Sequence, residues 1–285
     1  MNKLITALAT PYKNGKIDSY SYEKLVNFQI ENGVDTLLAV GTTAEAQLLY
    51  DCEKKLLVKL TKAISNVPVF VGIEGHSTKD AVRDAVMAEK LGADGLLVTP
   101  PAFVKCTPQG YLLHIKEILK AVSVPLMLYN APSRCNYVLD KDTVIELSNK
   151  VQYLKDAGND LDYTATLSKR LAVMCGNDFL LPHMLKNGAT GVVSVVSNVA
   201  PKLTREILNL DVQSFSKSSL CEQARRLELF QELANASMLE VSPIAIKYML
   251  YKKGIFDSYE MRLPLTAASE KTRKEIDELW SEDVQ

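Results

Sequence analysis

Cysteine, histidine and tryptophan are scarce in this chain, and their pattern excludes several kinds of site. The 285 residues include five cysteines, three histidines and one tryptophan. An odd number of cysteines without a Cys-x-x-Cys pair favours free thiols in a reducing compartment; they are Cys52, Cys106, Cys135, Cys175 and Cys221. The histidines lie far apart in sequence and show no metal-ligand spacing. We therefore expect no metal site.

An excess of one charge and long apolar runs are also missing. The 33 basic and 34 acidic residues give a formal net charge of −1, so nothing points to nucleic acid. No apolar run approaches the roughly 18 residues of a membrane helix. The start of the chain shows no signal-peptide pattern. We expect a cytoplasmic protein that binds neither nucleic acid nor membrane and needs no cofactor.

Apolar runs of strand length recur at regular intervals along the first two thirds of the chain. They are nearly continuous in apolar character, as expected of strands that are covered on both faces. Eight such runs are present: Leu4–Leu8, Thr36–Val40, Pro68–Ile73, Gly95–Thr99, Pro125–Tyr129, Val151–Ala157, Leu171–Cys175 and Gly191–Val196.

Helix-like segments alternate with these strands. They are Tyr20–Asn32, Cys52–Ser65, Thr78–Leu91, Thr107–Val122, Asp140–Lys150, Leu161–Arg170, Phe179–Lys186 and Pro201–Leu208. Three related phrases, Glu31–Asp35, Lys90–Asp94 and Lys186–Thr190, each place a glycine between a helix and the next strand. Eight strand–helix units predict an α/β fold with a parallel sheet closed into a (β/α)8 TIM barrel. An open doubly wound sheet is the alternative, although no Gly-x-Gly-x-x-Gly or phosphate-loop lysine motif supports it.

The last quarter of the chain contains no further strand pattern. Three helical patterns follow, at Ser216–Ala236, Ser242–Lys253 and Leu265–Trp280. We interpret residues 1–210 as the barrel and residues 211–285 as a C-terminal helical extension packed on it. We expect the extension to serve structure and oligomer contacts.

One predicted strand, within Val151–Gly158, ends near Lys155. Burying an ammonium group costs several kcal/mol unless it is paired, so a buried lysine tends to lose its proton. A neutral amine in a pocket is a nucleophile that can form a Schiff base with a carbonyl. The alternative is a strand-edge lysine whose stem lies along the surface and whose head is in water.

Other strands also end in polar residues, and active sites of this barrel class lie at the C-terminal ends of the strands. Taken singly, these residues have structural explanations: a core tyrosine with a bonded hydroxyl, turn threonines, or a surface ion pair. Together with Lys155 on one rim they favour catalysis. The polar residues are Thr42 and Thr43 after strand two, Tyr129 at the end of strand five and Arg134 after it; Gly176 after strand seven and Val193 on strand eight belong to the same rim.

These motifs, in their order and spacing, resemble the pyruvate-dependent class I aldolases related to dihydrodipicolinate synthase and N-acetylneuraminate lyase. The resemblance covers nearly the whole chain. It rests on Ala9-Thr10-Pro11, Gly41-Thr42-Thr43-Ala44-Glu45, Leu128–Arg134, Leu154-Lys155-Asp156, Cys175-Gly176-Asn177-Asp178 and Gly188–Val195.

The resemblance implies a role for each rim residue. Lys155 forms an imine with pyruvate, and the resulting enamine adds to an aldehyde. Tyr129 donates and accepts protons. The remaining roles are a proton relay for Thr43, binding of the pyruvate carboxylate by Thr42 and Thr43, shaping of the floor by Gly176 and Val193, and binding of the second substrate's carboxylate by Arg134.

The Pro132-Ser133-Arg134 form favours the synthase reaction, in which the aldehyde is aspartate semialdehyde and the pathway is lysine and diaminopimelate biosynthesis. One alternative is another lyase or aldolase of the family that acts on a sugar acid, such as N-acetylneuraminate or a 2-keto-3-deoxy acid. A catalytically silent member is the other. The resemblance also implies a homotetramer built as a dimer of dimers.

The sequence departs from the family pattern in three places. Phe103 stands where the synthases have a tyrosine that completes the proton relay across a subunit interface, and Ala44 replaces a glycine. If the missing hydroxyl limits the rate, Phe103→Tyr should raise turnover; an unchanged rate would mean that another group fills the role. Finally, the positions that match the lysine feedback site are poor partners for lysine, so we expect no lysine inhibition: Ala46, Gln47, Asp51, Lys54, His76, Asp80 and Ala102.

Overall fold

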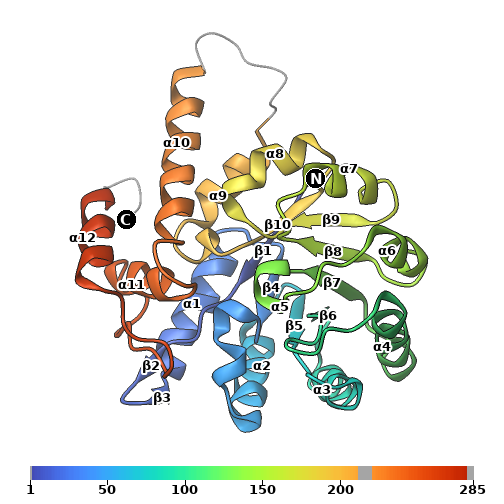
Figure 1. Ribbon diagram of the computed structural model, residues 1–285. Helices are drawn as coiled ribbons and strands as arrows, with labels where there is room; N and C mark the ends of the chain where they lie inside the picture. The colour runs from blue at the N-terminus through green and yellow to red at the C-terminus, as the bar shows by residue number, and fades with distance from the viewer. Residues whose placement is uncertain (1, 211–219, 281–285) are drawn as a thin grey trace.

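Eight parallel strands close into a barrel in the computed structural model, which describes residues 2–210 and 220–280 (Figure 1). Neighbouring strands follow the order β1-β10-β9-β8-β7-β6-β5-β4, and β1 pairs with β4 to close the ring. The predicted TIM barrel is therefore confirmed, and the open sheet is wrong. The strands are β1 (Lys3–Ala7), β4 (Thr36–Ala39), β5 (Val69–Ile73), β6 (Gly95–Val98), β7 (Leu126–Asn130), β8 (Tyr153–Asp156), β9 (Ala172–Cys175) and β10 (Gly191–Ser194).

Helices that follow the strands surround the barrel in Figure 1. Their bounds lie within a few residues of the predicted ones: α1 (Ser19–Glu31), α2 (Asp51–Ile64), α3 (Thr78–Lys90), α4 (Pro108–Ala121), α6 (Lys141–Leu147), α7 (Leu161–Leu167), α8 (Leu181–Lys186) and α9 (Pro201–Leu208). The sequence patterns missed the short elements, namely the hairpin β2 (Tyr12–Lys13) and β3 (Lys16–Ile17), the helix α5 (Pro132–Cys135) and four 3-10 turns.

Local chemistry explains where the surrounding helices begin and end. The side chains of Asp18, Ser77 and Thr107 each accept a hydrogen bond from a backbone N–H in the first turn of the next helix. Such caps satisfy donors that have no partner within the helix. After α1 and α3, Gly33 and Gly92 take positive φ angles of 74° and 88°, a conformation that glycine adopts without strain.

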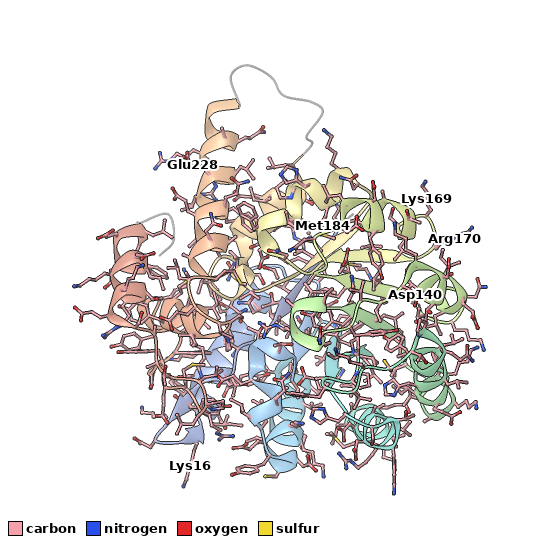
Figure 2. The ribbon with its side chains drawn as sticks, viewed as in Figure 1. Lys16, Asp140, Lys169, Arg170, Met184 and Glu228 are labelled. Atoms are coloured by element: carbon pink, nitrogen blue, oxygen red, sulfur yellow. The ribbon has the colours of Figure 1, made fainter. Side chains whose placement is uncertain are left out.

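The core has two layers. Seven strands each place an apolar side chain inside the barrel; these side chains are Ile5, Leu38, Phe70, Leu97, Met127, Met174 and Val193. A larger apolar layer lies between the strands and the helices. Charged side chains such as Lys16, Lys169 and Glu228 project outward, whereas Met184 is buried (Figure 2). The barrel interior is thus a packed core that leaves room for chemistry only at its rim.

The C-terminal helices are α10 (Leu220–Ala236), α11 (Ile244–Lys252) and α12 (Glu270–Leu279), and they lie together on one side of the barrel (Figure 1). Residue 210 is described, but residue 211, where the extension is predicted to begin, and the predicted helix start at Ser216 lie outside the described residues. The helical extension as a separate region stays a prediction.

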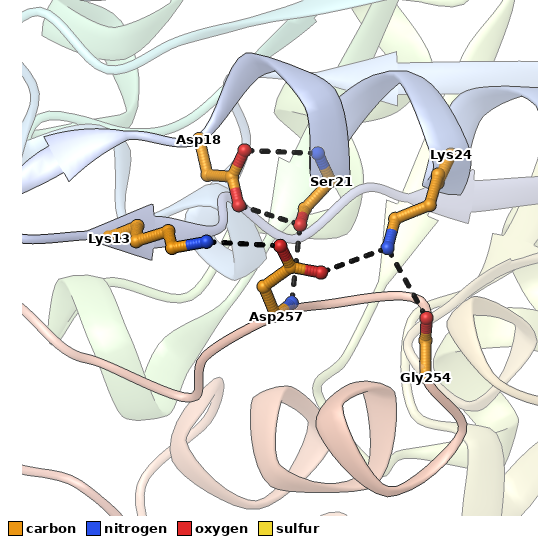
Figure 3. Close-up of polar contacts among 6 residues, drawn as sticks. All are labelled: Lys13, Asp18, Ser21, Lys24, Gly254 and Asp257. Carbon is orange, nitrogen blue, oxygen red and sulfur yellow. Dashed lines mark hydrogen bonds and ion pairs between the residues drawn. The ribbon is translucent and has the colours of Figure 1, made fainter.

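Polar contacts tie the segment after α11 to the start of the chain (Figure 3). Asp257 forms ion pairs with Lys13 and Lys24, each with an N–O distance of 3.1 Å. The backbone N–H of Asp257 also donates to the Ser21 hydroxyl, which donates in turn to Asp18. These contacts hold the C-terminal segment against α1.

Within the described ranges, no helix has the length and apolar character that crossing a membrane requires.

Candidate active site

Lys155 and Tyr129 lie side by side at the C-terminal ends of β8 and β7. The two residues are partners in the parallel ladder, so their side chains point to the same face of the sheet. Both are 5% exposed, and the Lys155 Nζ lies 4.3 Å from the centroid of the Tyr129 ring. The interpretation of Lys155 as a solvated strand-edge lysine is therefore wrong. The structure gives instead a buried amine with a phenol beside it.

A cavity of about 360 Å³ opens above these two residues. Six of the seven residues that the sequence singled out line it: Thr42, Thr43, Tyr129, Arg134, Lys155 and Gly176. The seventh, Val193, lies below the cavity in the barrel interior and packs in the same apolar cluster as Tyr129. Arg134 is exposed at the mouth, whereas Thr43 is buried. A small acid or ketone fits such a volume.

The strand end that carries Lys155 is held rigidly. Asp156 accepts hydrogen bonds from the Asn130 amide at 2.8 Å, the Gly158 N–H at 2.9 Å and the Thr164 hydroxyl at 3.0 Å. Burial raises the pKa of Asp156, and these three bonds oppose that rise by favouring the charged form. The carboxylate thus fixes the backbone next to the amine.

Gly176 directly follows β9, where the chain runs close to the end of β8. Its N–H donates to the Asp156 carbonyl at 2.8 Å. A Cβ atom at this position would lie 2.9 Å from that carbonyl oxygen, a distance that real Cβ atoms do not tolerate. Glycine at this position therefore permits the close approach of the two backbones beside the cavity.

The two threonines sit on a 3-10 turn, η1 (Thr42–Ala44), directly after β4. Ala44 lies within this turn, so alanine is accommodated where the family pattern has glycine. The left-handed conformation falls one residue later, at Glu45, whose φ is 57°. Glu45 is buried and paired, which compensates for the strain of that conformation.

Glu74 is a rim residue that the sequence patterns missed. It follows β5 immediately, and the Thr42 hydroxyl donates to its Oε1 at 3.5 Å. Burial raises its pKa to about 7, although Lys54, Arg134 and Lys155 all favour the charged form. The rule that chemistry gathers at strand ends could have found it, but a single acid forms no motif.

The C-terminal helices supply a second wall that local patterns could not predict. Five residues of α10 and the segment that follows it line the cavity: Ala234, Ser237, Met238, Val241 and Ser242. Met238 and Val241 are each at least 60% exposed, so the apolar part of this wall is open to solvent. The barrel rim supplies most of the polar groups of the cavity, including the Lys155 amine, the Arg134 guanidinium and the Asp178 carboxylate.

Phe103 projects away from the fold. Its side chain is 98% exposed and its φ is 65°, in the left-handed region. It is not among the residues that line the cavity of this chain.

Over the described ranges, histidine, cysteine and acidic side chains form no group of three or more that could hold a metal ion.

The fold and the cavity define a class of protein: a (β/α)8 barrel with a buried lysine beside a tyrosine at the rim. Comparison with known proteins narrows the class. The model of the dihydrodipicolinate synthetase family matches residues 1–282. The chain belongs to this family.

Named relatives and solved structures agree with that assignment. The 4-hydroxy-tetrahydrodipicolinate synthase of Rickettsia typhi is 36% identical, over 96% of this chain and 94% of its own. The enzyme of the same name from Methylacidiphilum fumariolicum has a structure with a TM-score of 0.91 and 31% identity, covering 98% of this chain and 94% of the other. The structure of dihydrodipicolinate synthase from Thermotoga maritima has a TM-score of 0.89 and 34% identity, covering 98% of this chain and 97% of the other.

Proposed function

We propose that this chain is a class I aldolase that condenses pyruvate with aspartate semialdehyde to form 4-hydroxy-tetrahydrodipicolinate. The observation that carries the proposal is the buried Lys155 amine, 4.3 Å from the ring centroid of Tyr129, in a cavity that also holds Thr42 and Thr43. Family membership over residues 1–282 and the names of the relatives support the same reaction.

The first half of the reaction is imine formation. The Lys155 amine attacks the ketone carbon of pyruvate, and the carbinolamine loses water to give the imine. We assign the proton transfers of this step to Tyr129, because its ring lies beside the Lys155 amine and a phenol both donates and accepts. Thr42 and Thr43 bind the pyruvate carboxylate through the turn that follows β4, and Thr43 relays protons.

The second half is carbon–carbon bond formation. The protonated imine withdraws electrons, so the pyruvate methyl group loses a proton and an enamine forms. The enamine carbon then attacks the aldehyde carbon of the second substrate. Arg134, exposed at the mouth of the cavity, binds that substrate's carboxylate through its planar fork. Gly176 and Val193 shape the space beside and below the imine.

A coupled assay tests the proposal. Aspartate semialdehyde with pyruvate is compared with cleavage of N-acetylneuraminate and of 2-keto-3-deoxy sugar acids. We expect turnover with aspartate semialdehyde and little with the sugar acids. Faster turnover of a sugar acid would assign the chain to another reaction of the fold. A lack of turnover with every substrate would mark it as catalytically silent.

Arg134 should govern the second substrate and leave the first unaffected. Arg134→Ala is expected to raise the KM for aspartate semialdehyde by about tenfold to a hundredfold, since a charged hydrogen bond contributes roughly 1.5–3 kcal/mol. The KM for pyruvate should change less than threefold. Steady-state kinetics with each substrate varied in turn provide the measurement, and Lys169→Ala on the outer surface is the control. Equal changes in the two KM values would contradict the assignment.

Lysine should not inhibit the enzyme. Two alanines, Ala46 and Ala102, and a lysine, Lys54, stand at the positions that match a lysine feedback site. They offer few acceptors for an amino-acid ligand. Activity measured with added lysine at millimolar concentration should therefore stay constant. A sharp loss of activity would contradict this prediction.

The location and the assembly are also part of the proposal. Cys52, Cys106, Cys135 and Cys175 are free thiols, which fits a cytoplasmic protein. The apolar side chains of Tyr50, Phe103 and Val104 are 72%, 98% and 52% exposed, which fits burial in a homotetramer. Light scattering after size exclusion should give about four times the 31.6 kDa of one chain. A monomer mass would contradict the tetramer.

A further inference from the structure

Glu74 is an acid at the active-site rim to which the reaction described above gives no role. It lies directly after β5, and its Oε1 accepts a hydrogen bond from the Thr42 hydroxyl at 3.5 Å. Its Oε2 is enclosed by protein and has no hydrogen-bond partner among the described residues. A buried carboxylate oxygen without a partner is unfavourable, so it needs an explanation other than stability.

The charges around Glu74 come from three sides. Lys54 lies on α2, Arg134 on α5 and Lys155 on β8, and each favours the charged carboxylate. Glu74 and Lys54 also line a small cavity of about 10 Å³ behind the site. Burial opposes ionisation more strongly than these cations favour it, which places the pKa of Glu74 at about 7. The group can therefore hold or release a proton near neutral pH.

The Thr42 hydroxyl connects this acid to the catalytic cavity. Thr42 lines the cavity together with Tyr129 and Lys155, whereas Glu74 is not among the lining residues. The family resemblance places a proton relay at Thr43, but the hydroxyl whose contact with an acid is seen here is that of Thr42. Phe103 leaves the expected tyrosine hydroxyl missing. Glu74 offers an acid–base group within this chain.

We propose that Glu74 is the proton-holding residue of the relay and that it acts through the Thr42 hydroxyl. This rests on the proposed aldolase function. When the carbinolamine loses water, Tyr129 gives its proton to the departing oxygen. The Thr42 hydroxyl then passes a proton to Tyr129, and Glu74 gives its own proton to Thr42. When the enamine forms, the proton travels in the opposite direction and the Glu74 carboxylate receives it. Glu74 gives up one proton in the first step and receives one in the second, so it returns to its starting state. It is a positioning residue because it does not touch the substrate.

Glu74→Gln tests the proposal because glutamine keeps the shape and removes the acid. We expect kcat to fall about a hundredfold, at the lower end of the range of acid–base effects because Glu74 acts through a second group. The KM for pyruvate should change less than threefold. In the unaltered enzyme kcat should fall between about pH 6 and 8, as Glu74 loses the proton that it must supply when the carbinolamine loses water. This fall in kcat at basic pH should be absent in Glu74→Gln, a change that a purely structural role would not produce.

Asp84→Asn is the matched control, since Asp84 lines the same small cavity as Glu74 but hydrogen-bonds to Arg83 on the surface. Asp84→Asn should keep both kcat and the fall in kcat at basic pH. Thr42→Val is the second variant, because it removes the hydroxyl and retains the shape. If Glu74 acts through Thr42, the double variant Thr42→Val/Glu74→Gln should have a kcat less than twofold below that of Thr42→Val alone.

The outcomes separate this proposal from the aldolase function itself. Borohydride reduction with pyruvate is run on the unaltered enzyme, and a missing adduct together with no turnover would mean that the aldolase function is wrong. An active enzyme in which Glu74→Gln keeps its kcat and still loses activity between about pH 6 and 8 would overturn the role of Glu74 alone. The role of Glu74 would also be overturned if the double variant lost kcat by the product of the two single losses. A kcat that rises more than tenfold in Phe103→Tyr would overturn it as well.

Discussion

Lys155→Met is expected to abolish the covalent pyruvate adduct and to lower kcat by about 10³-fold or more, because the nucleophile is lost. Methionine keeps a similar unbranched shape in a position that is 5% exposed, so the cavity should retain its form. Borohydride reduction with pyruvate, followed by peptide mass mapping, measures the adduct. Turnover with aspartate semialdehyde measures the rate.

The chain provides a sharp internal control for this experiment. Lys247 is as deeply buried as Lys155, but its ammonium pairs with Glu45 at 2.7 Å. Lys247 is fully enclosed and does not line the cavity, so pyruvate cannot reach it, and the adduct should map to Lys155 and be absent from Lys247. Lys169→Met, on the outer surface, should behave like the unaltered enzyme. An adduct that persists in Lys155→Met would show that another amine reacts with pyruvate.

The barrel could be predicted from the sequence because each of its strands is apolar on both faces and each is followed by a helix. Glycines such as Gly33 and Gly92 stop the helices in a conformation that few other residues adopt. What the patterns missed are elements too short to show a period, such as α5 at Pro132–Cys135 and the hairpin at Tyr12–Ile17. Tertiary contacts, and not local propensity, decide these segments.

The site was predictable to the extent that it lies at the ends of strands. Lys155 and Tyr129 end neighbouring strands, and ladder register brings them together without further information. Glu74 also follows a strand, but an isolated acid has no distinguishing pattern until its contact with Thr42 is seen. The wall that includes Met238 depends on how α10 packs against the barrel, which helical periodicity does not encode.

The C-terminal helices also support the site from behind. Lys247 on α11 pairs with Glu45, which directly follows the turn that carries Thr42 and Thr43. The Lys247 Nζ lies 4.2 Å from the centroid of the Tyr12 ring, and the Arg262 guanidinium carbon lies 4.6 Å from the same centroid. Both cations are attracted to the face of the ring. The buried pair therefore links the helical region to the threonine turn.

The charges of this pair are enclosed, since both side chains are 0% exposed. Burial raises the pKa of Glu45 and lowers that of Lys247 to about 8, while each partner favours the charged form of the other. Lys247 thus remains mostly protonated at neutral pH. Glu45 Oε2 has no hydrogen-bond partner among the described residues, so the carboxylate depends on Lys247 through its other oxygen.

Lys247→Met should therefore lower the free energy of unfolding by about 3–5 kcal/mol, because it leaves a buried carboxylate without its partner. The double variant Glu45→Gln/Lys247→Met should recover much of that loss, since it removes both charges. Urea unfolding at fixed protein concentration gives the measurement. Lys120→Met breaks an exposed pair with Glu117 and should cost at most about 1 kcal/mol. If Lys247→Met costs no more than Lys120→Met, the buried pair does not hold the threonine turn in place.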